Sequence, residues 1–245
     1  IGRDVTQYQT GDQVYGYTGL GMGTYAQYIC LGEKPSALAS VISKRPANIP
    51  YEEAATVPFG GLEALHSLDR VDVRRGQKVL IVGAGGSIGT YSVQLAKHYG
   101  AEATGVDSGG KLDMLRSIGA DHVIDYKRED YTQNGQKYDV ILDTIGGSPF
   151  AGSVRSLNKN GTYLNVNPKL HHRLQMGWMK GKSNKKLLSW EAGYTTKNLL
   201  RLKELIEAGA IKPVIDRVYP LEQVAKAHRY VETDEKKGNV VIVIE

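Results

Sequence analysis

Cysteine, phenylalanine and long apolar runs are scarce in this sequence, and the scarcity excludes several classes of protein. Among 245 residues there is one cysteine, Cys30, and there are two phenylalanines. A lone cysteine forms no disulfide within the chain and supplies no multi-cysteine zinc site, which favours a reducing, cytoplasmic location. The longest aliphatic run, residues 240–244, is far shorter than the roughly 20 residues of a membrane-spanning helix. The sequence therefore predicts no membrane span.

Charge is nearly balanced over the whole chain but not locally. The 31 Lys and Arg residues exceed the 26 Asp and Glu residues by five, which permits anion binding without indicating nucleic acid. Residues 169–186 contain six Lys or Arg and no acid, and two tryptophans, Trp178 and Trp190, lie in or near this stretch. Such a pattern is open to a membrane-surface or nucleic-acid interpretation. We favour a solvated, mobile insertion instead.

The first 31 residues alternate turn signals with short β-prone stretches. Residues 11–16 and 23–28 are predicted to form short antiparallel strands. Because two or three strands alone are marginally stable, we expect them to belong to a β domain whose earlier strands precede Ile1. A loop follows at residues 45–50, and a helix is predicted to begin at Tyr51.

From Lys78 the pattern alternates between short apolar runs and helical periodicity. Strands are predicted at residues 78–82, 103–106, 122–125, 138–142 and 162–166, with helices at 89–99, 111–118 and 150–157 between them. This order predicts an α/β fold with a doubly wound parallel sheet, a Rossmann domain. Helices at 196–208 and 221–231 and a strand at 240–244 complete the chain. We expect three segments, 1–50, 51–209 and 210–245, of which the second is the Rossmann domain.

A glycine-rich turn follows the first of these strands. Residues 79–89 read VLIVGAGGSIG, and the glycine pattern departs from G-x-G-x-x-G because position 88 is Ile. A dinucleotide pyrophosphate needs bare backbone N–H groups at a helix N-terminus, and glycines allow that approach. The predicted cofactor-binding residues here are Gly83, Gly85, Gly86, Ser87, Ile88 and Gly89. Alternatively, the glycines only permit tight packing of strand against helix.

An acidic residue stands where such domains bind the adenosine ribose. Asp107 follows the next predicted strand, eighteen residues beyond Gly89, and a carboxylate there accepts hydrogen bonds from ribose hydroxyls and repels a 2′-phosphate. Ser108 and Lys111 come directly after it and are suited to hold that phosphate. The residues alone leave the choice between NADH and NADPH open. Asp107 also has an alternative role as a turn residue that begins the next helix.

Longer stretches carry a family resemblance. Residues 83–100 (GAGGSIGTYSVQLAKHYG) and 105–126 (GVDSGGKLDMLRSIGADHVIDY) resemble the zinc-independent, quinone-oxidoreductase-like branch of the medium-chain dehydrogenase/reductase family. Upstream, GDQVYG (11–16), GTYAQY (23–28) and AATVP (54–58) are similar to the end of that family's GroES-like catalytic domain. Downstream, residues 139–146, 161–163 and 212–241 keep the family's order. The resemblance covers nearly the whole chain.

The resemblance implies an oxidoreductase that transfers a hydride from NAD(P)H to a quinone, enone or aldehyde without zinc, with the nicotinamide between two domains. It assigns Gly86, Ser87 and Ile88 to the pyrophosphate, and Ser108, Lys111 and Tyr126 to the adenosine end. The nicotinamide end is assigned to Asp143, Thr144, Ile145, Asn165, Val166 and Asn167. NADP(H) is favoured and NAD(H) tolerated. The expected partner is a small carbonyl, quinone or enone substrate, with no nucleic acid; a homodimer is allowed.

Several features depart from the family pattern. Glu63 stands where such chains often have Thr, Asn167 replaces a usual glycine, and Asn239 replaces a frequent Lys. Family chains also begin with some tens of further residues, so we expect this chain to be truncated and its catalytic residue to be unidentifiable here. The histidines are expected to lie on the surface or to pack in the core, without metal. The competing hypothesis is a non-enzymatic dinucleotide-binding protein, redox-sensing or structural, on the same fold.

Overall fold

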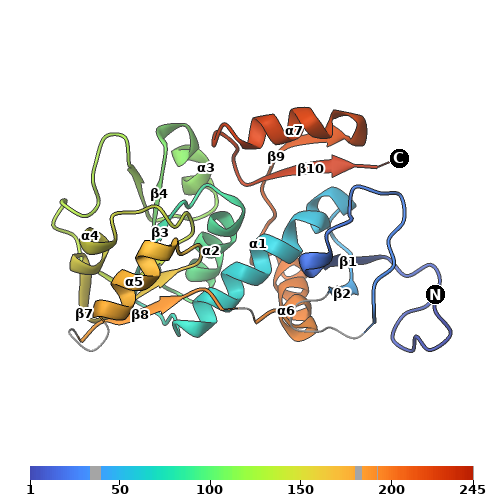
Figure 1. Cartoon of the computed structure of the whole chain (residues 1–245), viewed down its shortest axis with the longest axis horizontal. Coiled ribbons are helices and arrows are strands. Elements are labelled where there is room, and N and C mark those ends of the chain that lie inside the picture. The colour runs from blue at the N-terminus through green and yellow to red at the C-terminus, as the bar shows by residue number, and fades with distance from the viewer. Residues whose placement is uncertain (34–39, 180–183, 192, 245) are drawn as a thin grey trace. The chain divides into compact units, whose positions relative to one another are not determined.

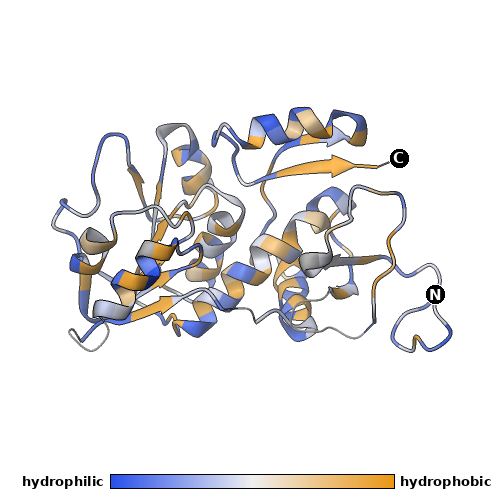
Figure 2. Cartoon of the chain, in the orientation of Figure 1, coloured by the Kyte–Doolittle hydropathy of each residue, from blue (hydrophilic) through white to orange (hydrophobic). Residues whose placement is uncertain are grey.

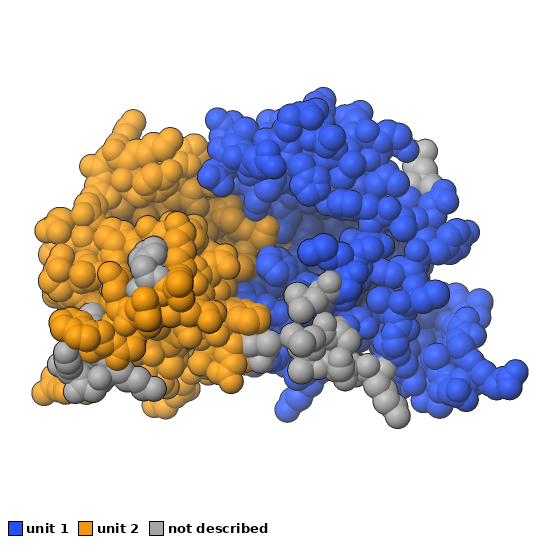
Figure 3. All heavy atoms as spheres, viewed as in Figure 1, with its two compact units in different colours: residues 1–63, 192–245 blue, residues 64–191 orange. Residues whose placement is uncertain are grey.

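The computed structural model describes residues 1–33, 40–179, 184–191 and 193–244, which form two compact units (Figure 3). Unit 1 consists of Ile1–Glu63 and Ala192–Glu245, and unit 2 of Ala64–Glu191. The chain passes from unit 1 to unit 2 within the helix α1 (Tyr51–Arg70), which begins where the sequence predicts a helix. These boundaries at 63 and 191 differ from the expected 50 and 209, and the GroES-like nature of the first segment stays a prediction.

Unit 2 is built on a six-stranded parallel sheet (Figure 1). Its order is β5-β4-β3-β6-β7-β8, and every neighbouring pair is parallel. The strands are β3 (Lys78–Val82), β4 (Glu102–Asp107), β5 (His122–Asp125), β6 (Tyr138–Asp143), β7 (Leu157–Asn165) and β8 (Lys186–Ser189). The winding direction reverses between β3 and β6, which is the point where open α/β sheets bind ligands. The predicted doubly wound α/β fold is confirmed.

Helices separate these strands along the chain, except between β5 and β6. They are α2 (Ser87–His98), η2 (Gly109–Lys111), α3 (Leu112–Ser117), α4 (Phe150–Arg155) and α5 (Leu170–Met179). Strands of the sheet are strongly apolar (Figure 2), and all of Val79, Leu80, Ile81 and Val82 in β3 are buried. An uninterrupted apolar run of this kind forms a strand covered on both faces, because the crossover helices of a parallel sheet lie on both sides.

The basic stretch 169–186 is not an irregular insertion where the structure describes it. It contains α5, and Lys186 begins β8, the last strand of the sheet. Met176 of α5 is buried in the core of unit 2, and Leu187 of β8 packs against the same cluster. The expectation of a mobile insertion is therefore wrong for the described residues. The apolar contacts of Met176 and Leu187 attach this segment to the core of unit 2, and the basic composition of the segment gives no sign of them.

Unit 1 contains two small sheets. In the first, β1 (Val14–Tyr17) pairs antiparallel with β2 (Val41–Lys44), and in the second β9 (Ile215–Pro220) pairs parallel with β10 (Asn239–Val243). Its helical segments are η1 (Gly19–Gly21), α6 (Thr196–Glu207), η3 (Leu221–Gln223) and α7 (Val224–Val231). The predicted strand at 23–28 is wrong: β1 pairs instead with β2, and Tyr25 and Tyr28 are largely exposed.

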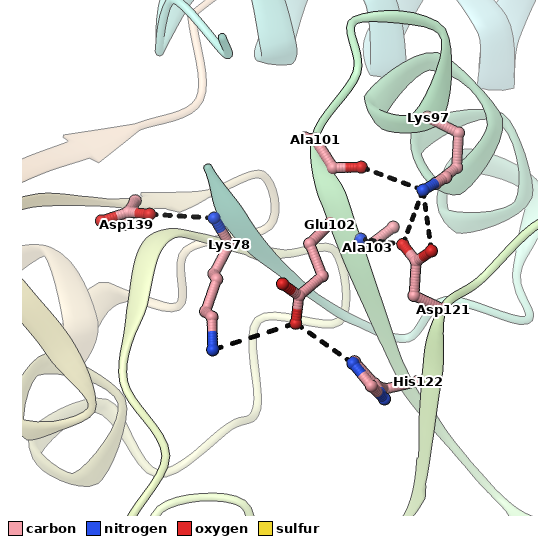
Figure 4. A network of polar contacts seen from close by, with 8 residues as sticks. All are labelled: Lys78, Lys97, Ala101, Glu102, Ala103, Asp121, His122 and Asp139. Carbon is pink, nitrogen blue, oxygen red and sulfur yellow. Dashed lines mark hydrogen bonds and ion pairs between the residues drawn. The ribbon is translucent and has the colours of Figure 1, made fainter. Parts of the chain in front are cut away.

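Charged side chains hold the amino-terminal ends of the strands of unit 2 together (Figure 4). The Glu102 carboxylate lies 3.9 Å from the Lys78 ammonium and 3.1 Å from His122 Nε2. Lys97 Nζ binds Asp121 at 2.8 Å, and Asp121 also accepts a hydrogen bond from the backbone N–H of Ala103. His122 thus belongs to the surface, as expected. This edge of the sheet has structural pairs, which leaves the carboxyl edge for a ligand.

Candidate functional site

The glycine turn after β3 begins with a conformation that favours glycine. Gly83 has φ +78°, and its N–H and that of Ala84 both donate to the carbonyl of Val106 in β4, at 3.0 and 3.1 Å. A Cβ atom at Gly83 would lie 2.6 Å from Thr144 Oγ1. The turn therefore needs glycine for two reasons, because a side chain would be strained and would displace the loop that follows β6.

Gly86 and Gly89 differ in the space around them. A Cβ atom at Gly89 would lie 2.5 Å from Ala84 Cα, so this glycine lets helix α2 approach the turn closely. At Gly86, the residue before α2, a Cβ atom would meet only the Gly83 carbonyl oxygen, at 3.4 Å. Open space lies over a helix N-terminus, where orphan N–H groups and the helix dipole favour an anion. These glycines fit a dinucleotide pyrophosphate.

Asp107 and Lys111 form an ion pair beside this turn. Lys111 Nζ lies 3.0 Å from Asp107 Oδ1, and their side chains are only 10% and 8% exposed. Asp107 Oδ2 accepts a hydrogen bond from the N–H of Gly85 at 2.8 Å, and its Oδ1 accepts one from Ser108. Sequence reasoning treats Asp107 and Lys111 as opposing influences on a 2′-phosphate. In the structure they neutralise each other and link the end of β4 to the glycine turn.

Two further residues predicted for the adenosine end, Ser108 and Tyr126, lie close to Asp107. Ser108 precedes η2 in an extended conformation. Tyr126 follows β5, donates its backbone N–H to the Asp107 carbonyl at 3.2 Å and is 57% exposed as a residue. The four residues predicted for this end therefore come together after β4 and β5, and Tyr126 is exposed there.

Asp143, predicted for the nicotinamide end, is fully buried at the end of β6. Its Oδ1 accepts hydrogen bonds from the N–H groups of Ile145 and Gly146, and its Oδ2 accepts from the hydroxyls of Ser148 and Tyr163. All four bonds lie within unit 2. The carboxylate therefore holds the loop after β6 in place. Within this loop Thr144 is buried, with its hydroxyl donating to the Val82 carbonyl at 2.9 Å, and Ile145 is 55% exposed.

Asn165 and Asn167 tie the loop after β7 to the same region. Asn165 is fully buried, donates to Tyr163 Oη at 3.3 Å and accepts from the N–H of Asn167 at 3.0 Å. A Cβ atom at Gly146, which has φ +64°, would lie 2.7 Å from the Asn167 carbonyl carbon. The loops after β3, β6 and β7 thus contact one another, and Val166, between the two asparagines, is buried.

Ser148, Tyr163, Tyr131 and Ser153 are buried polar residues that sequence reasoning misses. Tyr131 Oη lies 2.7 Å from Ser153 Oγ, and burial raises the pKa of Tyr131 to about 12. Burial and the Asp143 carboxylate raise the pKa of Tyr163 as well. The excess of tyrosine over phenylalanine, 15 to two, is the one sequence signal of such a network. A phenol inside a sheet needs a polar partner, which phenylalanine does not.

The raised pKa of Tyr131 predicts a loss of stability at alkaline pH. The phenol ionises near pH 10 when unfolded but near 12 when folded, so the unfolded state binds fewer protons between these values. Stability is full below pH 10 and falls by about 1 to 3 kcal/mol as the pH approaches 12. Urea unfolding of Tyr131→Phe should show a smaller alkaline loss than the unsubstituted protein. Tyr28→Phe, at a 91% exposed position, is the control; an equal loss in both variants contradicts the assignment.

A surface cavity in unit 2 lies beside the loop that follows β6. Its volume is about 490 Å³, and its lining comes from the loop before β6, from residues 147–149 of the loop after β6, from α4 and from α5, including Thr132, Phe150, Arg155, His172 and Gln175. None of the predicted cofactor residues lines it. We therefore locate the candidate site by the strand ends and the glycine turn rather than by this hollow.

Two departures from the family pattern have structural explanations. Glu63, 2% exposed in α1, accepts a hydrogen bond from the hydroxyl of Tyr194, and both belong to unit 1. Asn239 binds the Val214 carbonyl through both its backbone N–H, at 2.9 Å, and its side-chain amide, at 3.0 Å. Glu63 is thus a buried carboxyl group whose hydrogen-bond partner is the Tyr194 phenol. Asn239 holds the start of β10 beside the start of β9.

The described residues offer no group of metal ligands. Among them, no three His, Cys, Asp or Glu side chains are grouped so as to hold a metal ion, and Cys30 is exposed. A protein zinc site needs at least three such ligands. The described residues therefore do not fit zinc, and we derive no step through one. Within the described chain no helix is long and apolar enough to cross a membrane.

The parallel sheet, its reversal between β3 and β6 and the glycine turn define a Rossmann-type α/β domain. Residues 118–242, about half of the chain, match the family model described as "Zinc-binding dehydrogenase". The chain belongs to this family, in the quinone-oxidoreductase-like branch of the medium-chain dehydrogenases/reductases.

Individual relatives agree with this assignment. The mouse protein "NAD(P)H oxidoreductase RTN4IP1, mitochondrial" is 29% identical over 270 residues, covering 98% of this chain and 66% of its own length. The "NADPH-dependent alkenal/one oxidoreductase, chloroplastic" of Arabidopsis thaliana is 30% identical and covers 99% of this chain and 60% of its own length. The solved quinone oxidoreductase of Coxiella burnetii shares the fold, with a TM-score of 0.85 at 24% identity over 100% of this chain and 76% of that one. The chain thus spans about 66% and 60% of the length of these two curated relatives.

Proposed function

We propose that unit 2 binds a nicotinamide dinucleotide and that the chain is part of an oxidoreductase transferring a hydride from NAD(P)H to a quinone, enone or aldehyde without zinc. The observation that carries this proposal is the turn between β3 and α2, where Gly83, Gly86 and Gly89 have three different steric roles around one helix N-terminus. The mouse and Arabidopsis relatives, named as an NAD(P)H oxidoreductase and an alkenal/one oxidoreductase, support the chemistry.

The residues of unit 2 have distinct parts in this proposal. The N-terminal turn of α2, with Ser87 and Ile88, holds the pyrophosphate over Gly86. Ile145, which is exposed, orients the nicotinamide end together with Thr144 and Asn167. The bound nicotinamide supplies the hydride, and the protein supplies position and exclusion of water.

The preferred cofactor within this proposal is NADPH, with NADH tolerated within about two orders of magnitude. Lys111 offers a 2′-phosphate an ammonium, and such charge-assisted hydrogen bonds contribute about 1.5 to 3 kcal/mol. Asp107 opposes the phosphate, but its charge is partly neutralised by Lys111 itself. A cytoplasmic location and a homodimer are the remaining parts of the proposal; the two relatives above are named mitochondrial and chloroplastic.

Turnover measurements test the proposal against a non-enzymatic dinucleotide-binding protein. The full chain is expected to oxidise NADPH when given a panel of quinones, enones and aldehydes, and chelator treatment should leave the rate unchanged. Calorimetry with NADPH and NADH measures binding in parallel. Binding without turnover on any acceptor favours the non-enzymatic hypothesis. Absence of binding by folded protein at millimolar cofactor rejects both.

A further inference from the structure

Helix α5 carries large apolar side chains on its outer side. Leu170, Leu174 and Trp178 are 75%, 68% and 71% exposed. They are spaced four residues apart, so they form one stripe along the helix, which we call the α5 stripe. Large apolar side chains exposed in a contiguous row on a globular domain mark an interaction site.

The opposite side of α5 packs against the core of unit 2. Met176 is 7% exposed and belongs to the core of unit 2, and the His172 ring lies 6.2 Å from the ring of Phe150 in α4. The helix therefore packs on the domain with one side and exposes apolar side chains on the other. Core packing explains the first side but not the α5 stripe.

The stretch of sequence that contains the stripe carries charge of a single sign. Residues 144–190 contain eight Lys or Arg and no Asp or Glu, whereas the rest of the chain has 23 basic and 26 acidic residues. Two of the basic residues, Lys169 and Arg173, are exposed beside Leu170 and Leu174. An apolar helix face with a tryptophan and flanking cations is suited to the interface of a membrane with anionic lipids.

We propose that the α5 stripe docks on the surface of an anionic phospholipid bilayer. Leu170, Leu174 and Trp178 enter the boundary between headgroups and acyl chains, while Lys169 and Arg173 bind lipid phosphates. A second copy of this chain is a poorer occupant, since a self-complementary contact brings two patches of the same charge together. Nucleic acid is a poorer one too, because its phosphates bind cations but leave the leucines without a partner. The proposal does not depend on cofactor binding.

Flotation with vesicles tests the proposal on the full chain. The protein should float with vesicles of equal parts phosphatidylcholine and phosphatidylglycerol, and at least about tenfold less with phosphatidylcholine alone. Added salt should weaken the binding. In Trp190→Phe, Trp178 is the one remaining tryptophan, and its emission should shift to shorter wavelength on the anionic vesicles. Equal binding to both vesicle types, or none to either, overturns the proposal.

Variants distinguish binding through the α5 stripe from nonspecific binding to vesicles. Leu174→Glu should lower the bound fraction about tenfold or more, with unchanged melting temperature and unchanged calorimetric binding of NADPH. Leu200→Glu, at a 44% exposed leucine on α6, is the matched control and should bind vesicles normally. An equal loss in both variants contradicts the proposal. So does a protein that binds heparin but no vesicles, or one whose sedimentation shows a dimer that Leu174→Glu dissociates.

Discussion

Replacing Gly86 by valine is expected to weaken dinucleotide binding strongly while the protein keeps its thermal stability. Gly86 has φ −86° and ψ −179°, an extended conformation that a β-branched residue adopts readily. The protein leaves this position open, since a Cβ atom would meet only the Gly83 carbonyl oxygen at ordinary contact distance. The valine methyls would fill the space over the N-terminus of α2 that the pyrophosphate needs. We expect a loss of affinity of about 100-fold or more, which is about 2.7 kcal/mol, measured by calorimetry.

Gly89→Val provides the contrast, because its Cβ atom would overlap the backbone of Ala84. This variant should lose about 3 kcal/mol of stability together with cofactor binding. Gly110→Ala, at a site with nothing within 4 Å of the new atom, is the control for both measurements. If folded Gly86→Val binds NADPH as well as the unsubstituted protein does, the glycines serve only the packing of strand against helix, and the proposed pyrophosphate site is wrong.

Removing the Lys111 ammonium is the second change with a large expected effect. Lys111→Met leaves the Asp107 carboxylate buried without its cation, and breaking a buried ion pair costs about 3 to 5 kcal/mol. The same change removes the cation offered to a 2′-phosphate and unmasks the opposing carboxylate. Urea unfolding should show the loss of stability, and calorimetry should show the ratio of NADPH to NADH affinity falling about tenfold or more.

Two further variants make this result specific. Asp107→Asn should raise the ratio of NADPH to NADH affinity, because the amide carries no charge against the phosphate. Lys97→Met removes a lysine from another Lys–Asp pair, at the amino-terminal edge of the sheet, where both side chains are about one-third exposed. It should cost about 1 kcal/mol or less and leave the ratio unchanged. An unchanged ratio in Lys111→Met would mean that Lys111 does not bind the phosphate and that Asp107 directs the site to NADH.

Local patterns in the sequence were sufficient to predict much of unit 2. The strand at Lys78–Val82 and the strand at His122–Asp125 have the predicted bounds, because β-branched residues between turn signals favour a strand locally. The glycine turn is equally local, since backbone freedom depends on the glycines themselves. The doubly wound order followed from the alternation of strands and helices.

Other features required contacts between residues far apart in the chain. The strand β1 pairs with β2 at Val41–Lys44, and the residue pattern of these two short strands does not predict this pairing. Residues 169–186 read as a solvated basic stretch, although α5 and β8 are attached to the sheet through Met176 and Leu187. A few buried contacts outweigh many exposed charges, because exposed charges remain solvated and contribute little to where a segment packs.

For the candidate site too, some features follow from the sequence and others only from the tertiary structure. The sequence by itself determined which residues follow the carboxyl ends of β3, β4, β5, β6 and β7, because that depends only on chain order within a parallel sheet. Only the tertiary structure decided that Asp107 and Lys111 neutralise each other and that Asp143 turns inward to Ser148 and Tyr163. Asp143 and Tyr163 lie twenty residues apart on neighbouring strands. Burial decides whether a carboxylate faces a ligand or the core, and burial is a property of the packed sheet rather than of any local run of residues.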